Sequence, residues 1–311
     1  MAESTPLVSI TSTVYNTRPY LLDMIKSILG QTFTDFEFVL LDDGSTDGSL
    51  ELAQSVVDPR IRVFSNGTNR GRSYTLNRLT GLSRGQYIAR MDSDDLSAPT
   101  RIERQVEFLE RHPKVDVVGT GVVYVSRDCA PLGIRRFPST HAEICCTPMR
   151  HFWIGHGTLL ARRTWFERFR YDESIGLAVD ANMYLRTYEQ STFANIGEPL
   201  YYYRFEPSFN LRKQLLTRRF VARYFFEHCR RAGRLDRAIW HAAIQYAKSA
   251  VTILLFSTGL QRRLFTHRFE PLTSAECAVH ARTLELIRSV PIVLRAPSGP
   301  AVRPLAERAD V

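Results

Sequence analysis

The stretch 87–95 reads YIARMDSDD and joins an apolar run to three aspartates. An apolar run of this length predicts a buried strand, and the aspartates predict a turn where that strand ends. Two other stretches have the same construction: residues 36–48 read FEFVLLDDGSTDG, and residues 7–16 read LVSITSTVYN. The sequence therefore predicts three strands that each end in polar residues.

Between these strands the apolar residues follow a helical period. Apolar residues at positions 21, 24, 25, 28 and 29 form one stripe and predict a helix that Gly30 ends. Further helices are predicted near 49–56, 73–82 and 100–111, with strands at 61–64 and 115–118. Alternating strands and helices indicate an α/β fold with a parallel sheet, which binds ligands beyond the carboxyl ends of its strands. We therefore expect the three polar strand ends to meet in one crevice.

Composition narrows the class of protein. The chain has 311 residues, of which 44% are hydrophobic, enough for a sizeable core in one or two domains. Five cysteines without a C-x-x-C pair argue against a disulfide framework and a zinc knuckle, and favour a reducing cytosol. The N-terminus has no basic and apolar leader, and no apolar run approaches the roughly 20 residues that span a bilayer. We therefore expect a cytoplasmic protein.

Charge divides the chain at about residue 210. Residues 1–209 carry 23 Lys and Arg against 25 Asp and Glu, whereas residues 210–311 carry 18 against 7. This division predicts a near-neutral catalytic body at 1–209 and a basic helical extension at 210–290. The Pro-rich stretch 291–311 is expected to be disordered.

The extension interleaves arginines with aromatic and aliphatic residues from 211 to about 260. This pattern is typical of an amphipathic helix on an anionic membrane, and also of a helical hairpin packed on the body with its arginines in solvent. Only four of the 41 basic residues are lysine, so a general preference for arginine is a further explanation. Because no nucleic-acid-binding motif accompanies the charge, nucleic acid is not expected as a partner.

The carboxylates of Asp92, Asp94 and Asp95 bear most directly on chemistry. A solvated acidic loop is the simple explanation, because acidic turn residues are common. However, carboxylates at the end of an apolar strand cost free energy unless a cation or hydrogen-bond donors compensate them. Mg²⁺ or Mn²⁺ could do so, and such cations prefer one or two carboxylates together with diphosphate oxygens and water. The sequence thus predicts a divalent metal that binds with a nucleoside diphosphate. A dinucleotide or P-loop site is not expected, because neither G-x-G-x-x-G after the first strand nor G-x-x-x-x-G-K-[ST] occurs.

Three segments, in chain order, carry a resemblance to a known family. They read SITSTVYNTRPYLLDMIKSILGQTFTDFEFVLLDDGSTDGS (9–49), NRGRSYTLNRLTGLSRGQYIARMDSDD (69–95) and GLAVDANMYLRTYE (176–189). Over residues 6–206 the chain resembles the bacterial family 2 glycosyltransferases of the GT-A fold. This resemblance implies a Rossmann-like sandwich with a mainly parallel central sheet, followed by the α-helical extension. It divides the body into a nucleotide-binding half at 1–120 and an acceptor half at 121–209.

The resemblance also implies the reaction. Such enzymes transfer a sugar from a nucleoside-diphosphate sugar to an acceptor hydroxyl, usually with inversion of the anomeric centre. The Gln-x-x-Arg-Trp signature of processive synthases is absent, so addition of single sugars is expected. The acceptor would be a glycan or a lipid-linked glycan in cell-surface polysaccharide assembly. The enzyme would then work in the cytoplasm, with a peripheral contact at the inner face of the cell membrane.

Roles in nucleoside binding follow from the same resemblance. Thr13 and Tyr15 would contact the nucleoside, and Asp43 would accept a hydrogen bond from the base, for which uracil fits best. Asp92 would contact the ribose. A UDP-linked sugar is therefore the expected donor.

The diphosphate and its metal are assigned in the same way. Gly71, with Arg70 and Arg72 beside it, matches a loop that approaches the base and diphosphate. Asp94 would coordinate Mn²⁺ or Mg²⁺, and Asp95 would lie behind it. A metal ion neutralises the charge that builds on a leaving diphosphate.

Two residues of the acceptor half complete the expected site. Asp180 aligns with the aspartate of the family's Glu-Asp pair, although Val179 replaces the glutamate. We assign it as the general base that accepts the proton of the acceptor hydroxyl; the alternative is that it only caps the helix predicted from about 181 to 188. His156 matches a position near the acceptor entrance, with a purely structural histidine as the alternative.

Two other functions remain open from the sequence. A family member that has lost activity could be a nucleotide-binding or membrane-scaffold protein, because the glutamate at 179 and a histidine after Arg204 are missing. A sugar nucleotidyltransferase would share the parallel sheet and the metal-bound diphosphate. It would need a basic, Gly-rich loop after the first strand, and residues 14–17 do not form one.

Overall fold

The computed structural model describes residues 5–148, 152–205, 210–231, 233–260 and 269–295. Strands from both halves of the body join into a single mixed sheet. The strands are β1 (Val8–Val14), β2 (Phe36–Asp42), β3 (Ile61–Ser65), β4 (Tyr87–Asp92), β5 (Leu96–Ser97), β6 (Val117–Val125), β7 (Pro131–Arg135), β8 (Leu160–Arg162) and β9 (Phe193–Arg204).

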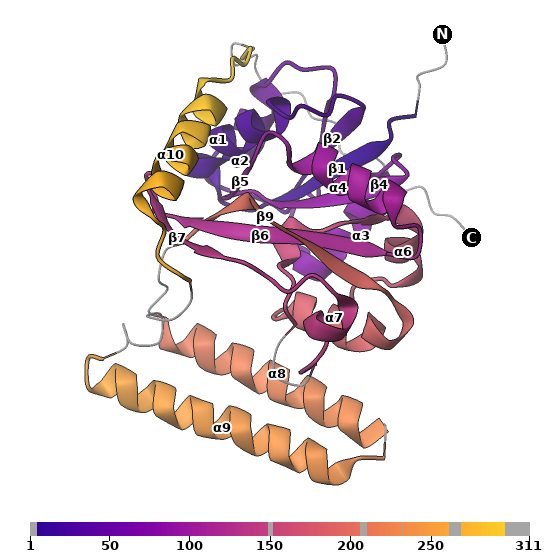
Figure 1. The fold of residues 1–311 in the computed structure, drawn as a ribbon, viewed down its shortest axis with the longest axis vertical. Coiled ribbons are helices and arrows are strands. Elements are labelled where there is room, and N and C mark those ends of the chain that lie inside the picture. The colour runs from indigo at the N-terminus through magenta and orange to yellow at the C-terminus, as the bar shows by residue number, and fades with distance from the viewer. Residues whose placement is uncertain (1–4, 149–151, 206–209, 232, 261–268, 296–311) are drawn as a thin grey trace.

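Helices connect these strands and follow the last of them. The α-helices are α1 (Arg18–Leu29), α2 (Ser49–Ser55), α3 (Arg72–Leu82), α4 (Arg101–Arg111), α5 (His141–Ile144), α6 (Arg163–Arg168), α7 (Val179–Thr187), α8 (Leu211–Arg231), α9 (Leu235–Ser257) and α10 (Ser274–Ser289). Two short 3₁₀ helices are η1 (His156–Thr158) and η2 (Tyr188–Gln190). Figure 1 shows the sheet with helices on its faces and the α8–α9 pair below it.

The sheet has the order β3-β2-β1-β4-β8-β6-β9-β5, with β7 paired to β6. The pairs β2–β3, β1–β2 and β1–β4 are parallel, so the βαβ prediction for the first part of the chain is confirmed. Beyond β4 the sheet becomes mixed: β8 runs antiparallel to β4 and β6, while β9 is parallel to β6. The strand predicted at 115–118 is wrong in its bounds, because β6 continues to Val125 and is buried along its length.

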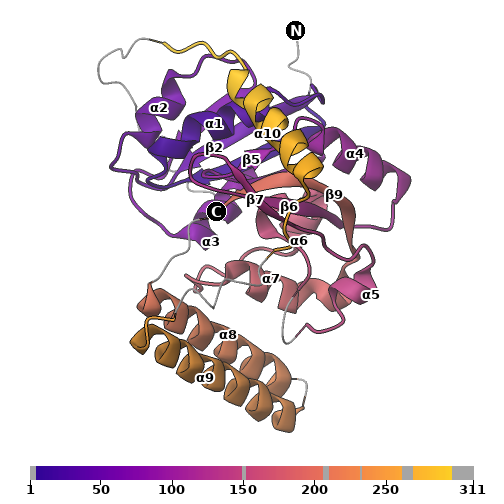
Figure 2. The ribbon, with the colours of Figure 1, turned by 60° about the vertical axis from the view of Figure 1, so that its left-hand side comes forward.

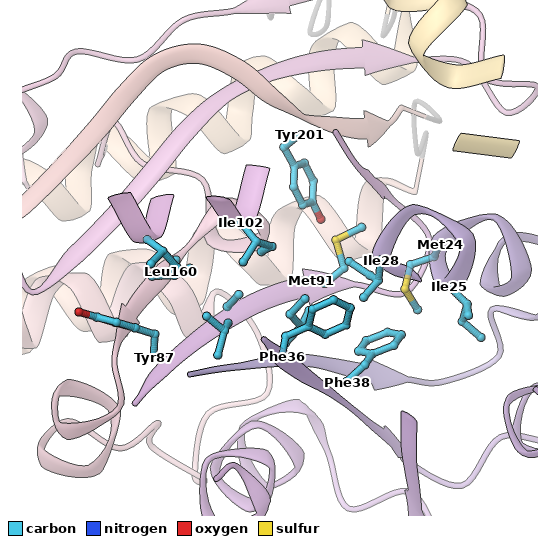
Figure 3. Packing of buried hydrophobic residues seen from close by; sticks show 14 of the residues in the cluster. Met24, Ile25, Ile28, Phe36, Phe38, Tyr87, Met91, Ile102, Leu160 and Tyr201 are labelled. Atoms are coloured by element: carbon cyan, nitrogen blue, oxygen red, sulfur yellow. The ribbon is translucent and has the colours of Figure 1, made fainter. Parts of the chain in front are cut away.

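The core forms on both faces of the parallel strands, because successive side chains of a strand point to opposite faces. On one face, Phe36 and Phe38 of β2 pack with Met24 and Ile28 of α1 and with residues of α4 (Figure 3). On the other face, the intervening residues Val39 and Leu41 pack with Leu79 of α3. The sheet is therefore covered on both sides, as expected for parallel strands that alternate with helices.

The predicted extension at 210–290 consists of two separate structures. Helices α8 and α9 form an antiparallel hairpin whose α8 contacts α7. Helix α10 instead returns to the body and packs against α1, where Lys26 Nζ donates a hydrogen bond to the Arg288 carbonyl over 2.8 Å. Figure 2 shows α10 on the body, and the α8–α9 hairpin away from α10 and next to α7. The boundary predicted at 209 lies outside the described residues.

The disorder predicted for 291–311 is wrong at its start. Val57 N–H donates to the Val293 carbonyl over 2.8 Å, and Arg295 N–H donates to the Ser55 carbonyl over 2.7 Å. These backbone hydrogen bonds hold the segment against the end of α2. A Pro-rich composition does not show that backbone groups will find such partners, so the sequence alone predicted disorder here. The rest of the stretch, from 296, lies outside the described residues. In the described part of the chain, no helix is long and apolar enough to cross a membrane.

Candidate active site

The predicted site residues follow the carboxyl ends of β1, β2 and β4, which lie side by side. Thr13 of β1 is in register with Leu41 of β2 and with Asp92 of β4. Asp43 directly follows β2, and its N–H donates to the Val14 carbonyl over 2.8 Å. Tyr15, beyond β1, has half of its surface exposed. The expected convergence of the three strand ends is therefore what the structure has.

Asp42 and Asp43 have separate structural roles. Asp42 accepts hydrogen bonds from the N–H groups of Gly44 and Ser45 and so closes the turn after β2. The Asp43 carboxylate accepts three hydrogen bonds from the loop before α3: from Asn66 Nδ2 at 2.7 Å, Arg70 N–H at 2.9 Å and Gly71 N–H at 3.1 Å. A carboxylate has about four acceptor positions. Asp43 therefore holds this loop and keeps one position for a further donor.

The loop that Asp43 holds leads into α3. Gly71 has a φ of 90°, a conformation that favours glycine, and α3 begins at the next residue. Arg72 then extends to β4, where its Nη2 donates to Asp92 Oδ1 over 2.9 Å. The Arg70 guanidinium lies over the Tyr74 ring, 4.7 Å from its centroid. The predicted group Arg70, Gly71 and Arg72 thus connects the end of β2 to the end of β4.

Asp92 lies between two arginines. Arg90, whose side chain is only 2% exposed, donates from Nη2 to the same Asp92 Oδ1 over 2.9 Å. Burial alone would raise the pKa of Asp92, but Arg90 and Arg72 hold that pKa below its usual value. Asp92 is therefore ionised at neutral pH. Its Oδ2 accepts no hydrogen bond from a described residue and is available to a ligand.

Asp95 is fully buried and holds the end of β9. Its Oδ2 accepts from the Tyr201 hydroxyl and its Oδ1 from Arg204 N–H, both over 2.7 Å. Burial, followed by the charges of Asp94 and Asp92, raises the pKa of Asp95 well above its usual value. Both oxygens of Asp95 are thus engaged within the protein.

Asp94 differs from its neighbours because no described side chain pairs with its carboxylate. Its backbone carbonyl accepts from Arg204 Nε over 2.8 Å, which fixes the main chain. Burial, and then the nearby charge of Asp92, raises the pKa of the Asp94 carboxyl. An unpaired carboxylate of this kind is stabilised by a cation more than by any group already present.

A divalent cation fits this donor set when the diphosphate completes it. No cluster of three or more His, Cys, Asp or Glu side chains suited to a metal occurs among the described residues. The protein can thus offer Asp94, whereas both oxygens of Asp95 are engaged by a tyrosine and a backbone amide, and Asp92 has only Oδ2 available beside its two arginines. Mg²⁺ and Mn²⁺ are commonly bound in this way, through one or two carboxylates and substrate phosphates. The residues present therefore fit a metal that arrives with its nucleotide.

His156 lies beside this group in η1. Its Nε2 is 2.7 Å from the Tyr171 hydroxyl, whereas its Nδ1 is buried and has no hydrogen-bond partner among the described residues. Burial, followed by the charges of Arg90 and Arg72, lowers the pKa of His156 well below its usual value. The imidazole is therefore neutral at pH 7. The next residue, Gly157, is required by packing, because a Cβ there would overlap the Tyr201 hydroxyl and lie 2.9 Å from Asp92 Oδ2.

Asp180 is the second residue of α7 and is half-buried. The N-cap of α7 is Ala178, in the left-handed conformation with a φ of 53°, so the interpretation of Asp180 as a cap is wrong. The carboxylates of Asp180 and Asp92 both act to raise the pKa of Tyr171, which indicates that both lie near that hydroxyl. The charges of Asp180 and Asp92 therefore both act on the Tyr171 hydroxyl that contacts His156.

Four residues of this site were missed by sequence reasoning: Arg90, Gly157, Tyr171 and Tyr201. A signal existed for Arg90, because an arginine inside an otherwise apolar strand must find a buried partner. Tyr171 and Tyr201 carried no such signal. Their hydroxyls reach the site from segments that only the folded sheet brings together with β4.

Comparisons with known proteins show the family to which this chain belongs. The model of the family described as "Glycosyl transferase family 2" matches residues 9–169. The chain is similar to the putative glycosyltransferase EpsE of Bacillus subtilis, with 35% identity over 205 residues that cover 64% of this chain and 73% of EpsE. Solved structures share the fold. S. aureus TarS in complex with UDP-GlcNAc matches with a TM-score of 0.57 and 18% identity, covering 70% of this chain and 66% of TarS.

A second structure extends the likeness over nearly the whole chain. The mannosyltransferase PcManGT from Pyrobaculum calidifontis, in complex with GDP-Man and Mn²⁺, matches with a TM-score of 0.56 and 18% identity, covering 92% of this chain and 87% of PcManGT. These likenesses show the GT-A fold that the sequence predicted. With the family model matching half of its residues, the chain belongs to glycosyl transferase family 2 and is a glycosyltransferase of that type.

Proposed function

We propose that this glycosyltransferase moves a sugar, with inversion at the anomeric carbon, from a UDP-linked donor to an acceptor hydroxyl, and that it needs a divalent metal. The network from Asp43 through the 70–72 loop to Asp92 carries the proposal. This network places the open acceptor position of Asp43 and the two arginines of the 70–72 loop at one edge of the sheet. The unpaired Asp94 lies at the same edge. A nucleoside diphosphate presents the complementary groups: a base N–H, ribose hydroxyls and phosphates.

The donor would lie across the ends of β1, β2 and β4. In this arrangement Asp43 accepts a hydrogen bond from the base through its remaining acceptor position, and Thr13 and Tyr15 contact the nucleoside. Asp92 Oδ2 accepts from the ribose. A uracil imide is a single N–H donor, so one open position on Asp43 suits uracil, or thymine with its identical imide, better than guanine with its two adjacent donors.

The diphosphate would lie between the 70–72 loop and Asp94. Arg72 is already oriented by Asp92, so its charge is held in place before the donor arrives. Asp94 would hold Mn²⁺ or Mg²⁺ together with phosphate oxygens, with Asp95 behind it. When bound, the metal supplies positive charge that neutralises the leaving diphosphate.

The acceptor side supplies the base. We assign Asp180 to accept the proton of the attacking hydroxyl, because it is a half-buried carboxylate beside the His156–Tyr171 pair. Attack from the face opposite the diphosphate inverts the anomeric centre. His156 is neutral at pH 7, and its Nε2 lies 2.7 Å from the Tyr171 hydroxyl, so it orients that hydroxyl on the acceptor side.

The acceptor would be a glycan or a lipid-linked glycan of cell-surface polysaccharide assembly. We place the enzyme in the cytoplasm, at the inner face of the cell membrane, where such acceptors present their hydroxyls. Both points extend the sequence-based expectation.

Calorimetric titration of UDP, GDP and dTDP, each with and without Mn²⁺, tests the donor assignment. We expect UDP to bind most tightly and only weakly without Mn²⁺. Asp94→Ala should remove the Mn²⁺ dependence and leave the weak, metal-free binding. Asp35→Ala is the matched control, because Asp35 is an exposed aspartate that precedes β2, at the opposite edge of the sheet.

Each other outcome contradicts a named part of the proposal. If GDP binds best, the assignment of Asp43 to an imide base is wrong; if dTDP binds best, the base is thymine and not uracil. Binding that is equally tight without Mn²⁺ would refute the metal assignment. If no diphosphate binds, the chain is a family member that has lost its donor site.

A further inference from the structure

Helix α9 is unusual in that its apolar side faces solvent. The residues that it buries are Ala238, Gln245 and Thr252, which are small or polar. Its large apolar residues are instead exposed, with Trp240 at 63% and Tyr246 at 64% of their surface. The exposed set comprises Leu235, Ile239, Trp240, Tyr246, Val251, Ile253 and Leu254. We call these seven residues the α9 outer face. An amphipathic helix of a globular protein normally has the opposite orientation.

A row of arginines lies beside this face. Arg212, Arg219, Arg223 and Arg230 are exposed on α8 at spacings of seven, four and seven residues, which puts them on one side of the helix. A groove of about 530 Å³ between the two helices is lined by Arg219 and Arg223 of α8 and by Tyr246 of α9, so the arginine row borders the α9 outer face. Residues 211–260 hold ten Lys and Arg but only two Asp and Glu.

We propose that the α8–α9 hairpin docks on a bilayer that contains anionic lipids, with the α9 outer face in the boundary between headgroups and acyl chains. An interfacial helix of this kind combines an apolar face with adjacent cationic residues, and it does not need to span the membrane. The arginine row would lie at the level of the lipid phosphates. No described helix could cross a bilayer, so the contact is peripheral.

Charge complementarity favours a bilayer over a second copy of this chain. In both views α9 lies on the far side of α8 from the sheet, so the body does not cover it (Figures 1 and 2). Two α9 outer faces packed against each other would bring two arginine rows close together, and like charges at an interface are repelled. An anionic lipid surface offers both the apolar environment and the opposite charge.

The hairpin is anchored on the part of the body that carries Asp180. Tyr224 and Phe225 of α8 are buried in the same cluster as Val179 and Met183 of α7. The Tyr224 hydroxyl also donates to the Leu177 carbonyl over 3.2 Å, close to the start of α7. Docking would therefore connect the acceptor half to the membrane surface. The inference itself rests on the hairpin alone and does not require the proposed donor site.

Vesicle flotation of the full chain tests the proposal, with no nucleotide or metal present, so that failure here is distinct from failure of the donor assignment. The vesicles are phosphatidylcholine alone, or an equal mixture of phosphatidylcholine and phosphatidylglycerol. We expect the protein to float with the mixed vesicles, and flotation to weaken as salt is raised. Trp240 emission should shift to the blue and become accessible to brominated lipids. Trp240→Phe identifies that signal against the two other tryptophans.

Matched variants separate the α9 outer face from exposed apolar surface in general. Ile239→Asp with Leu254→Asp should weaken partitioning by about tenfold or more, because two charges would enter an apolar boundary. Val279→Asp with Leu286→Asp on α10 is the control, because those side chains are equally exposed and lie on the body. Arg212→Gln with Arg219→Gln and Arg230→Gln should reduce the preference for anionic lipid.

Three results would overturn the proposal. The first is that the full chain does not bind the mixed vesicles. The second is that both aspartate pairs weaken binding equally, and the third is that the α9 outer face forms a dimer instead. Light scattering over a range of protein concentrations detects the dimer. A dimer that the α9 variants abolish, without any vesicle binding, would assign the face to a second copy.

Discussion

The carboxyl ends of β1, β2 and β4, where we propose that the donor binds, form one region of the molecule, which we call the donor edge. This region and the α8–α9 hairpin depart from ordinary protein architecture in opposite ways. At the donor edge two charged side chains are buried: Arg90 pairs with the partly exposed Asp92, and Asp95 accepts a hydrogen bond from the Tyr201 hydroxyl. In α9 of the hairpin the large apolar residues are exposed, whereas the residues that it buries are small or polar. Each departure costs free energy in the isolated chain. Both therefore indicate where the protein meets something else, a charged ligand at the first region and an apolar surface at the second.

The largest expected effect is on kcat and comes from Asp180, a residue outside the buried network of Arg90, Asp92 and Asp95. Asp180 pairs with no described side chain, so Asp180→Asn should leave the donor edge intact. We expect kcat to fall by about 10²- to 10⁴-fold, because the proton acceptor is lost. UDP affinity with Mn²⁺ and the unfolding temperature should stay unchanged. A measurement of sugar transfer beside calorimetry checks this, and unchanged transfer would remove Asp180 as the base.

A second substitution breaks the buried network itself. Arg90→Met removes one of the two guanidinium groups that hold Asp92 ionised, and Arg72 remains. We expect the free energy of unfolding to fall by about 2–3 kcal/mol, the cost of leaving a buried charge short of a partner. Arg111→Met is the control, because that side chain is 72% exposed, and it should change stability by less than about 0.5 kcal/mol. Urea unfolding measures both, and equal losses would mean that burial of Arg90 is unimportant.

The helices and strands that could be predicted from the sequence are those in which apolar residues recur regularly at the spacing of a helix or a strand. Helix α1 and strands β1, β2 and β4 lie within one residue of their predicted bounds, because turn residues mark their ends. The mixed half of the sheet could not be predicted in the same way. Strand β8 has three residues, and β9 pairs with β6 through register shifts near Gly121, so neither carries a clear period.

The site residues divide in the same way: those near the parallel strands could be predicted, and those from the mixed half of the sheet could not. Asp43 follows β2, Asp92 ends β4 with Asp94 beyond it, and Arg72 at the start of α3 bonds to Asp92. The hydroxyl of Tyr201 comes from β9 and could not be located before the sheet was known. In the hairpin, composition gave the positive charge but not the orientation of α9, since an apolar stripe does not reveal whether protein or another phase covers it.

Acidity provides a third, smaller test at the donor edge. Because the pKa of Asp94 is raised, protons compete with a metal for this carboxylate. We expect Mn²⁺-dependent UDP affinity to increase by about tenfold per pH unit below that pKa and to level off above it. In Asp94→Ala this pH dependence should be lost. If the variant keeps the same dependence, another group binds the metal.

Stability without metal should change with pH in the opposite direction. The pKa values of Asp94 and Asp95 are higher in the folded chain than in the unfolded one, so the folded chain holds more protons between the two values. The free energy of unfolding therefore falls as pH rises through this range. Hydrogen-bonded carboxylates with lowered pKa values, such as Glu37, contribute the reverse slope. The difference between wild type and Asp94→Ala gives the contribution of Asp94 together with its effect on Asp95, whose pKa the Asp94 charge raises.

The smallest expected effect concerns the hairpin in solution. Leu254 of the α9 outer face is 60% exposed, so Leu254→Asp removes little buried apolar surface. Without vesicles, we expect it to change the free energy of unfolding by less than about 0.5 kcal/mol, the usual range for a surface substitution. Urea unfolding at two protein concentrations checks this. A larger loss that grows with concentration would mean that a second copy already buries this face in solution, and the difference between the two regions would then be one of assembly rather than of environment.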